Sequence, residues 1–259
     1  MSERDGYPPG VPAWVTCLVG DLDAAADFYR QVFGWSWNVS TEHDYAVATL
    51  RGREVAGIGP VAAAGPDAGT GWVTEVRVED AAATADAVRA AGGSVLSGPL
   101  DLSPASILTV LADPAGAVLC AAQPVGRSGA QLVNEPSTWS MSALSTPDPA
   151  AVADFYHTVF GWERTDFGPT TLWQVPGYVG GEPTQPVPRD VVAVTHQAPA
   201  PARWGVDFWI ADVEAAADAA AAAGGQVITA PADRSGLPLR TALLADPDGS
   251  PFSVSQLLP

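Results

Sequence analysis

The sequence predicts an α+β protein built from two tandem copies of one module, each of roughly 120 residues. Two repeated blocks carry this prediction. The run DLDAAADFYRQVFGW at residues 21–35 returns as DPAAVADFYHTVFGW at 148–162, and the turn LADPAG at 111–116 returns as LADPDG at 244–249. Because both blocks keep their order and spacing, the two halves of the chain are expected to share one fold.

The first block predicts an amphipathic helix with defined ends in each copy. Asp21 and Asp148 are expected to cap the helix N-termini by accepting hydrogen bonds from backbone N–H groups. Gly34 and Gly161 are expected to end the helices in the left-handed conformation. Between these ends, aromatic and aliphatic side chains recur at helical spacing and predict a buried face.

Strands are expected on both sides of each helix. A short apolar run precedes the first helix of each copy, and a second strand-then-helix block follows at residues 75–95 and 207–227. Each DPxG turn then leads into a last strand. Each module is therefore expected to hold two βαβββ units. The first strands are predicted at 14–19 and 141–146, and the last strands at 117–122 and 250–255.

The modules are placed at residues 8–124 and 137–259. Residues 125–136 are interpreted as a linker because they are rich in Gly, Ser, Asn and Pro and show no periodicity. The stretch 181–201 contains five prolines and predicts a loop over the second module. Each module is long enough to bury a core of its own, so each copy is expected to fold alone.

Composition excludes some partners. The 29 acidic and 12 basic residues give a net charge of −17, so nucleic acid and anionic membranes are not expected partners. No apolar stretch reaches the length of a membrane-spanning helix, and residues 1–11 lack the pattern of a signal peptide. A cytoplasmic protein is expected, in which Cys17 and Cys120 stay reduced and form no disulfide. It is expected to be a monomer, with the two modules as a pseudo-dimer, or a homodimer.

Taken in order, these motifs resemble the vicinal oxygen chelate superfamily, the group of glyoxalases, bleomycin-resistance proteins and extradiol dioxygenases. The resemblance covers nearly the whole chain and occurs twice. It implies paired βαβββ units whose strands curve around a pocket. In active members it also implies a divalent metal held by His and Glu at three strand positions, which fall here on Trp14 and Met141, Val73 and Gly205, and Cys120 and Ser253.

None of these six positions carries His, Asp or Glu. A Zn, Fe or Mn site needs three or four converging nitrogen, oxygen or thiolate donors. The sequence therefore predicts that both modules lack the metal, and no cofactor is expected. His43 in a polar turn, His157 on a helix and His196 in the proline-rich stretch are expected to have surface or structural roles.

One carboxylate per module is expected to face the pocket. Strand periodicity places Glu75 and Asp207 at equivalent inward positions. In an apolar pocket they can act as general bases or accept hydrogen bonds from a ligand. The alternative is a structural salt bridge with Arg77 or another arginine. Arg240 is a candidate partner or anion anchor.

The nine tryptophans divide by position. Trp35 and Trp162 follow the helix-ending glycines and are expected to pack in the core. Trp14 and Trp209 are candidates for stacking on a flat ligand, with core packing as the alternative. The full candidate set for ligand binding is Trp14, Thr16, Arg77, Cys120, Met141, Trp209, Arg240 and Ser253.

Two functions remain open on these residues, beside a purely structural role. One is a metal-free protein that binds a hydrophobic or aromatic small molecule, in antibiotic resistance or in specialised-metabolite biosynthesis. The other is a metal-independent isomerase, cyclase or lyase that uses Glu75 or Asp207 as a general base. Because Trp14 corresponds to Met141 and Arg77 to Trp209, the two halves need not do the same job.

Overall fold

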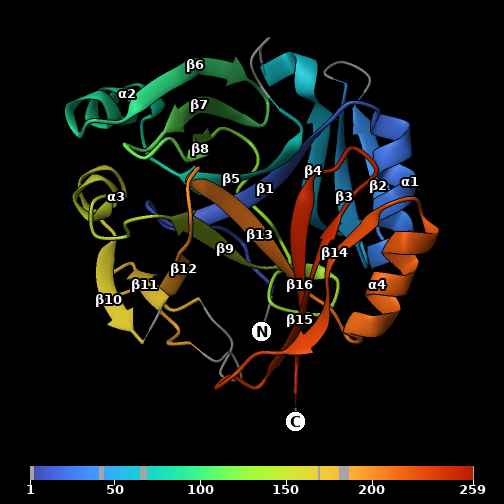
Figure 1. Cartoon of the computed structure of the whole chain (residues 1–259). Helices are drawn as coiled ribbons and strands as arrows, with labels where there is room; N and C mark the ends of the chain where they lie inside the picture. The colour runs from blue at the N-terminus through green and yellow to red at the C-terminus, as the bar shows by residue number, and fades with distance from the viewer. Residues whose placement is uncertain (1–2, 41–43, 65–68, 169, 181–186, 259) are drawn as a thin grey trace.

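The computed structural model describes residues 3–40, 44–64, 69–168, 170–180 and 187–258. The described chain forms two eight-stranded sheets, each with two α-helices (Figure 1). Both sheets are built from paired βαβββ units, as predicted. No helix among the described residues is long and apolar enough to span a bilayer.

The first sheet has the strand order β2-β3-β4-β1-β5-β8-β7-β6, so its two units meet where β1 pairs with β5. Its elements, in chain order, are β1 (Pro12–Val19), α1 (Leu22–Phe33), β2 (Ser36–Ser40), β3 (Tyr45–Leu50), β4 (Arg53–Pro60), a 3-10 turn (Val61–Ala64), β5 (Gly71–Arg77), α2 (Ala81–Ala90), β6 (Ser94–Leu102), β7 (Ser106–Ala112) and β8 (Val118–Pro124).

The second sheet repeats this topology with the order β10-β11-β12-β9-β13-β16-β15-β14. Its elements are β9 (Thr138–Thr146), α3 (Ala153–Phe160), β10 (Glu163–Phe167), β11 (Thr170–Gln174), β12 (Val191–Gln197), β13 (Arg203–Trp209), α4 (Val213–Ala222), β14 (Gln226–Asp233), β15 (Leu239–Ala245) and β16 (Pro251–Leu257).

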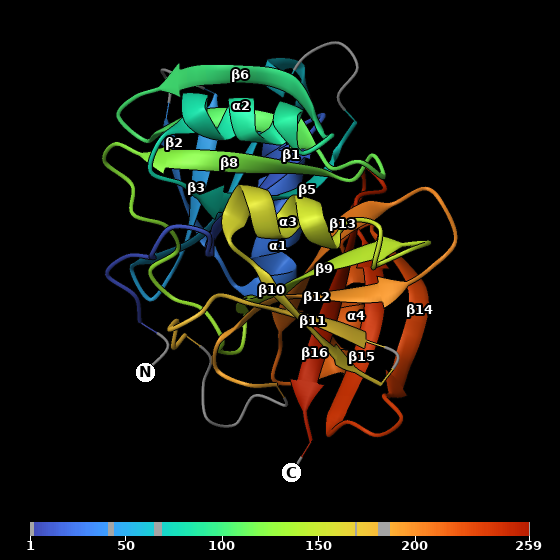
Figure 2. The ribbon, with the colours of Figure 1, turned by 90° about the vertical axis from the view of Figure 1, so that its left-hand side faces the viewer.

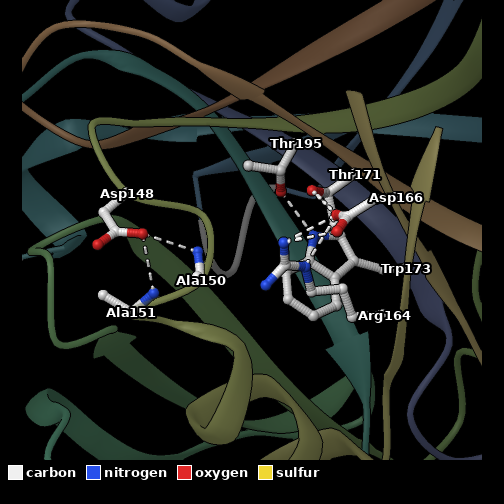
Figure 3. Close-up of polar contacts among 8 residues, drawn as sticks. All are labelled: Asp148, Ala150, Ala151, Arg164, Asp166, Thr171, Trp173 and Thr195. Atoms are coloured by element: carbon white, nitrogen blue, oxygen red, sulfur yellow. Dashed lines mark hydrogen bonds and ion pairs between the residues drawn. The ribbon is translucent and has the colours of Figure 1, made fainter. Parts of the chain in front are cut away.

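The helix ends follow the predicted caps with one difference. Asp21 accepts from Ala24 N at 3.0 Å, and Gly34 and Gly161 are left-handed with φ of 73° and 71°. Asp148 also accepts from two backbone N–H groups, but α3 begins only at Ala153 (Figure 3). The expectation that Asp148 caps the helix itself was wrong, because a tight turn over residues 149–152 lies between them.

Part of the proline-rich stretch is a strand. Residues 191–197 form β12, which lies between β11 and β9 in the sheet, so the prediction of a loop over 181–201 was wrong for this part. The run VVAV is apolar enough to be buried, and the prolines around it concealed the strand in the sequence. Residues 181–186 lie outside the described residues.

The outer strands of this unit are joined by polar side chains. Trp173 Nε1 donates to Thr195 Oγ1 at 2.6 Å, which ties β11 to β12. On the exposed side, Arg164 forms an ion pair with Asp166 at 2.8 Å, and Thr171 donates to the same carboxylate (Figure 3). Of these contacts, the hydrogen bond from Thr171 to Asp166 joins β11 to β10 at the edge of the sheet.

Segment 125–136 is packed against the first module. Ala130 is 1% exposed, and its N–H donates to Ala13 O at 2.8 Å. Gln131 N donates to Glu54 O at 2.7 Å. The segment therefore places its side chains beside β1 and β4, next to the candidate site.

Neither module forms a hydrophobic core from its own residues alone. One core joins the first unit of the first module to the second unit of the second module, and Phe33 packs on Phe208 with ring centroids 4.8 Å apart. The other core joins the two remaining units, from Val88 on α2 to Phe155 on α3. Helix α1 accordingly contacts α4, and α2 contacts α3 (Figure 1; Figure 2 looks onto the second pair). The expectation that each copy folds alone does not fit this arrangement.

A buried hydrogen-bond network links the modules at the first core. Tyr29 on α1 donates to Asp246 Oδ2 in the second module at 2.9 Å, and Trp72 Nε1 donates to the same Tyr29 hydroxyl at 3.0 Å. Asp246 belongs to the second DPxG turn, where its other oxygen accepts from Ser250 N at 2.8 Å. The DPxG turn of one module thus provides the hydrogen-bond acceptor for a tyrosine hydroxyl on the helix of the other module.

The second core repeats this network. Tyr156 on α3 donates to Asp113 Oδ2 at 2.8 Å, and Trp204 Nε1 donates to Tyr156 at 3.0 Å. The predicted packing of Trp35 and Trp162 in the core is confirmed, because each is 1% exposed. Each also donates its indole N–H to a backbone oxygen in the other half of the chain. Those acceptors are Ser137 O and Gly10 O, respectively.

Candidate functional site

The centre of the first sheet places the candidate residues of three strands side by side. Trp14 on β1 lies opposite Glu75 on β5, and Glu75 lies opposite Cys120 on β8. The side chains along β5 alternate between half-buried and buried, with Glu75 and Arg77 on one face and Thr74 and Val76 on the other. This is the alternation that strand periodicity predicted.

A chain of hydrogen bonds ends on Glu75. Trp14 Nε1 donates to Tyr45 OH at 2.9 Å, and Thr16 Oγ1 donates to Glu75 Oε1 at 2.7 Å. Tyr45 OH and Thr16 Oγ1 are 2.9 Å apart. Because the single Thr16 hydroxyl proton goes to Glu75, Tyr45 must be the donor in that pair. All donors therefore point along one path toward the carboxylate.

Tyr45 was not predicted from the sequence to belong to this site. Its ring lies over β4 where Gly57 and Gly59 face it, and a Cβ at Gly57 would overlap the Tyr45 hydroxyl. The pair of glycines in an otherwise apolar strand is the signal that a side chain approaches the backbone there. That signal shows that a group packs on β4 but does not identify it.

Arg127, which belongs to segment 125–136, was also not predicted to belong to this site. Its guanidinium lies 4.6 Å from the centroid of the Trp14 ring and 5.4 Å from that of Tyr45. Arg127 Nε is also 3.5 Å from Glu54 Oε2. A cation over two aromatic faces is attracted to both rings, so Arg127 holds segment 125–136 against Trp14 and Tyr45.

Trp14, Glu75 and Arg127 line a pocket of about 340 Å³, part of which is open to solvent, whereas Thr16, Tyr45 and Cys120 do not line it. We call it the module-1 pocket; its walls include Trp14, Glu75, Arg77, Arg127 and Pro124. Arg77 Nη1 is buried and has no hydrogen-bond partner. Among the described residues, Arg77 forms no ion pair with Glu75, so the salt bridge considered as a structural alternative is absent there.

Burial raises the pKa of Glu75, while the hydrogen bond from Thr16 and the charge of Arg127 lower it by less. Its second oxygen, Oε2, accepts no hydrogen bond from any described side chain. A carboxylate with one oxygen held and one oxygen unused can accept a hydrogen bond or a proton from a ligand.

The equivalent carboxylate of the second module has different surroundings. Asp207 accepts hydrogen bonds at 2.7 Å from each of Ser140, Ser253 and Ser255. Burial raises the pKa of Asp207, and the three serine hydroxyls oppose that rise. Asp207 therefore has its acceptor sites largely filled by the protein, and it does not line the module-1 pocket. The two carboxylates are equivalent in register but not in chemistry.

The other candidate residues are placed apart. Trp209 is half-buried on the Asp207 face of β13, and neither Trp209 nor Met141 lines the module-1 pocket. Arg240 does not join these groups, because its guanidinium forms ion pairs with Glu214 at 2.5 Å and Asp233 at 2.6 Å. Arg240 as a partner of Asp207 was therefore wrong, since these nearer carboxylates occupy its donors.

Two of the histidines have structural contacts. His157 Nδ1 lies 3.2 Å from Trp162 O at the end of α3, and His196 Nδ1 lies 3.3 Å from Thr170 Oγ1. Burial lowers the pKa of His196. His43 lies outside the described residues.

The residues at the three family metal positions do not fit a divalent metal. In the first module, Trp14 offers an N–H donor, Val73 an alkyl group and Cys120 a buried thiol whose pKa is raised by burial and by Glu75. Across the part of the chain that the structure describes, no group of three or more His, Cys, Asp and Glu side chains is arranged to hold a metal ion. A hard-metal site needs at least three converging donors.

The raised pKa of Glu75 predicts how stability depends on pH. When a carboxyl group has a higher pKa in the folded than in the unfolded state, stability falls as the pH rises between the two values. For Glu75 this window begins near its ordinary value of 4.5 and extends upward. We expect Glu75→Gln, whose amide oxygen can still accept from Thr16, to raise the unfolding temperature at pH ~7.5 by roughly 2–4 °C per kcal/mol of relieved desolvation.

Thermal unfolding of both proteins at pH ~7.5 and pH ~4 measures this effect. The difference between them should shrink at the lower pH, because the wild-type carboxyl is then neutral as well. A variant less stable than the wild type at the higher pH would show that the buried charge is not a cost to the folded state.

Comparisons with known proteins match both halves of the chain. Residues 12–121 match the Glyoxalase/Bleomycin resistance protein/Dioxygenase superfamily, and residues 141–255 match the glyoxalase-like domain. The chain is 34% identical to the candidate glyoxylase CFP32 of Mycobacterium bovis, over 100% of this chain and 99% of that protein. It is 29% identical to the anthracycline biosynthesis protein DnrV of Streptomyces peucetius, over 97% of this chain and 94% of that protein.

Solved structures show the same fold at low identity. The Mn(II)-bound glyoxalase from Novosphingobium aromaticivorans matches with a TM-score of 0.66 and 16% identity, over 97% of this chain and 83% of that one. The 2,3-dioxygenase LapB from Pseudomonas sp. KL28 matches with a TM-score of 0.63 and 14% identity, over 96% of this chain and 93% of that one. Two matched modules, a shared topology and a full-length relative together show that this chain belongs to the glyoxalase, bleomycin resistance protein and dioxygenase superfamily.

Proposed function

We propose that the chain binds a planar, hydroxylated aromatic molecule in the module-1 pocket, without a bound metal. The observation that carries this proposal is the set of groups around that pocket. Glu75 Oε2 is an unused acceptor, Arg77 Nη1 is an unused donor, and at the pocket wall the Arg127 guanidinium lies over the ring of the buried Trp14. A ligand that pairs a phenolic O–H with a carbonyl or phenolate oxygen on a flat ring system satisfies both polar groups.

The chemistry of one group of relatives supports this ligand class. DnrV and DauV, which are 29% and 27% identical to this chain, are named as anthracycline biosynthesis proteins. Anthracyclines contain a planar hydroxylated quinone ring system, which has the donor and acceptor pattern that the pocket requires. We place the chain in specialised aromatic metabolism on this basis, with protection from an aromatic antibiotic as the related role.

The assembly and the compartment belong to the same proposal. The two cores shared between modules support a monomer whose halves act as a pseudo-dimer. Cys17 and Cys120 are both free and buried, which fits a reducing cytoplasm. In this proposal the partner of the chain is a small molecule, with no role for nucleic acid or a membrane surface.

Titration with 1,4-dihydroxyanthraquinone and a panel of hydrophobic aromatic compounds tests binding. We expect saturable quenching of tryptophan fluorescence in the wild type and an affinity at least about tenfold weaker for Arg77→Ala, since a hydrogen bond to a charged group contributes about 1.5–3 kcal/mol. The matched control is Arg30→Ala, which removes an equal charge from an exposed pair with Asp27. Absence of saturable quenching across the panel, or equal weakening by both variants, would contradict the proposal.

A second candidate function is favoured by the same carboxylate. A general base needs a raised pKa and an unused oxygen next to the ligand, and Glu75 has both while Asp207 has its oxygens bonded to serines. A metal-independent isomerase, cyclase or lyase would therefore use Glu75. In that case Glu75→Gln lowers turnover of the bound substrate by about 10²–10⁴-fold, whereas Asp207→Asn keeps turnover. Full turnover in Glu75→Gln excludes this candidate.

A further inference from the structure

The side chains that lead out of the module-1 pocket along the sheet form an apolar strip. Ala122 on β8 lines the pocket and lies opposite Leu108 on β7, and Leu108 lies opposite Leu100 on β6. Ser106 also lines the pocket, and it lies opposite Leu102 on β6. Residues directly opposite one another on neighbouring strands share one face of the sheet, with Cβ atoms about 4.5–5.5 Å apart. We call Leu100, Leu102 and Leu108 the leucine strip; it continues the pocket wall toward the edge of the sheet.

The leucine strip faces solvent, in contrast to the other face of the same strands. Leu100 is 37% exposed and Leu102 is 45% exposed. On the other face Thr109 is 0% exposed and donates to Ala81 O at 3.3 Å, because α2 packs against β6, β7 and β8 there (Figure 2). Contiguous exposed apolar side chains beside a pocket are typical of a ligand-binding groove.

The second module has no apolar counterpart of the row that ends at Leu100. In the first module the row runs across β5, β8, β7 and β6 as Arg77, Ala122, Leu108 and Leu100. In the second module the equivalent row runs across β13, β16, β15 and β14 as Trp209, Ser255, Thr241 and Ala232. Because both sheets have the same topology, the fold itself does not require leucines in this row. They occur in the module whose pocket has the unused polar atoms.

The register also sets the distance between the polar groups of the pocket and the strip. Neighbouring strands lie about 4.8 Å apart, and Leu100 is three strands away from Arg77, so the two are separated by roughly 14 Å along the sheet. A ligand that contacts both must be elongated, with its polar groups at one end.

We propose that the leucine strip determines specificity by binding an apolar extension of the ligand held in the module-1 pocket. This inference rests on the function proposed above and narrows its ligand class. The ligand is an elongated aromatic molecule whose hydroxyl and carbonyl groups lie beside Glu75 and Arg77. Its other end is an apolar ring or alkyl chain that covers Leu100 and Leu102, and removal of that apolar surface from water favours binding.

Fluorescence titration with three matched compounds tests this specificity. In 1,4-dihydroxyanthraquinone, the parent compound, both hydroxyl groups are on one terminal ring. The 6-butyl derivative carries an alkyl chain on the opposite terminal ring, and the 2-butyl isomer carries the same chain on the hydroxylated ring. We expect the 6-butyl derivative to bind at least about tenfold more tightly than the parent, because tenfold is about 1.4 kcal/mol, roughly the burial of two methylene groups. The equally apolar 2-butyl isomer should bind no more tightly than the parent.

The combined substitution Leu100→Thr and Leu102→Thr should remove this gain. Threonine favours strands, and both leucines are exposed, so the double variant should unfold at the wild-type temperature. It should bind the 6-butyl derivative only as tightly as the parent, with the affinity for the parent unchanged. Ile228→Thr is the matched control, because Ile228 is 51% exposed on β14, the corresponding edge strand of the second module. It should change none of the three affinities.

The outcomes separate this inference from the function on which it rests. If none of the three compounds binds the wild type saturably, both are contradicted. If the parent binds and Arg77→Ala weakens it, but the 6-butyl derivative gains nothing, the function stands and the specificity role is overturned. Equal gains from the two butyl isomers, or a gain that persists in the double variant, overturn that role as well. So does sedimentation of the wild type as a homodimer and of the double variant as a monomer, which would assign the leucines to a second copy of the chain.

Discussion

A fragment that ends after residue 134 is expected to have no folded monomeric state. In the intact chain, the aromatic face of α1 is covered by the second module, where Phe33 packs on Phe208 and Phe28 packs on Phe252. Each large apolar side chain returned to water costs about 1.5–3 kcal/mol. Exposing several such side chains together costs as much free energy as the whole stability of a typical domain, which is about 5–15 kcal/mol.

Sedimentation of the separate fragments measures their oligomeric state, and near-UV circular dichroism measures whether they are folded. Residues 1–134 and 135–259 are each expected to be unfolded or to form homodimers, because each fragment holds one copy of both unit types and two copies can pair them. Mixing the two fragments should restore a native-like spectrum. A fragment that sediments as a monomer and unfolds cooperatively would show that one module closes its own core.

The second large effect is expected at the hydrogen bonds between modules. Asp246→Ala removes the acceptor of both Tyr29 O–H and Ser250 N, which leaves two buried donors unpaired at about 1–3 kcal/mol each. We therefore expect a loss of about 2–6 kcal/mol in the free energy of unfolding, measured by denaturant titration. Asp113→Ala is expected to cost a similar amount, because Asp113 accepts from Tyr156 and from its own turn.

A double-mutant cycle isolates the contact itself. Tyr29→Phe combined with Asp246→Ala should show a coupling energy of about 0.5–3 kcal/mol, since the two residues share a hydrogen bond. Tyr29→Phe combined with Asp113→Ala is the matched control, because these residues belong to different cores and should be additive within about 0.5 kcal/mol. Equal coupling in both cycles would mean that the substitutions act through general loosening of the fold.

Much of the fold follows from local sequence. The duplicated blocks determine two copies of one topology, the glycines at 34 and 161 end their helices, and strand alternation places Glu75 and Asp207 on inward faces. These features depend on residues close together in the chain, where capping and periodicity act. The strand β12 escaped prediction because prolines surround a short apolar run.

The site was predictable only in part, because its chemistry depends on neighbours across strands. Two carboxylates at matching positions differ because one lies beside a single threonine and the other beside three serines. Arg127 reaches the module-1 pocket, and Tyr45 accepts a hydrogen bond from the pocket residue Trp14; they come from a segment and a strand that carry no recognisable motif. Their roles depend on which groups the folded chain places within hydrogen-bond or ring-contact distance.

The sequence by itself determined a tandem pair of glyoxalase-like modules and the βαβββ units within them. Only the tertiary structure decided that the modules share both cores and that Glu75 keeps an unused oxygen where Asp207 does not. It also left polar atoms of Arg4, Asn134 and Trp139 buried without a hydrogen-bond partner. Periodicity and capping act over a few residues and can be read from the sequence, whereas burial and hydrogen-bond pairing depend on contacts between distant parts of the chain.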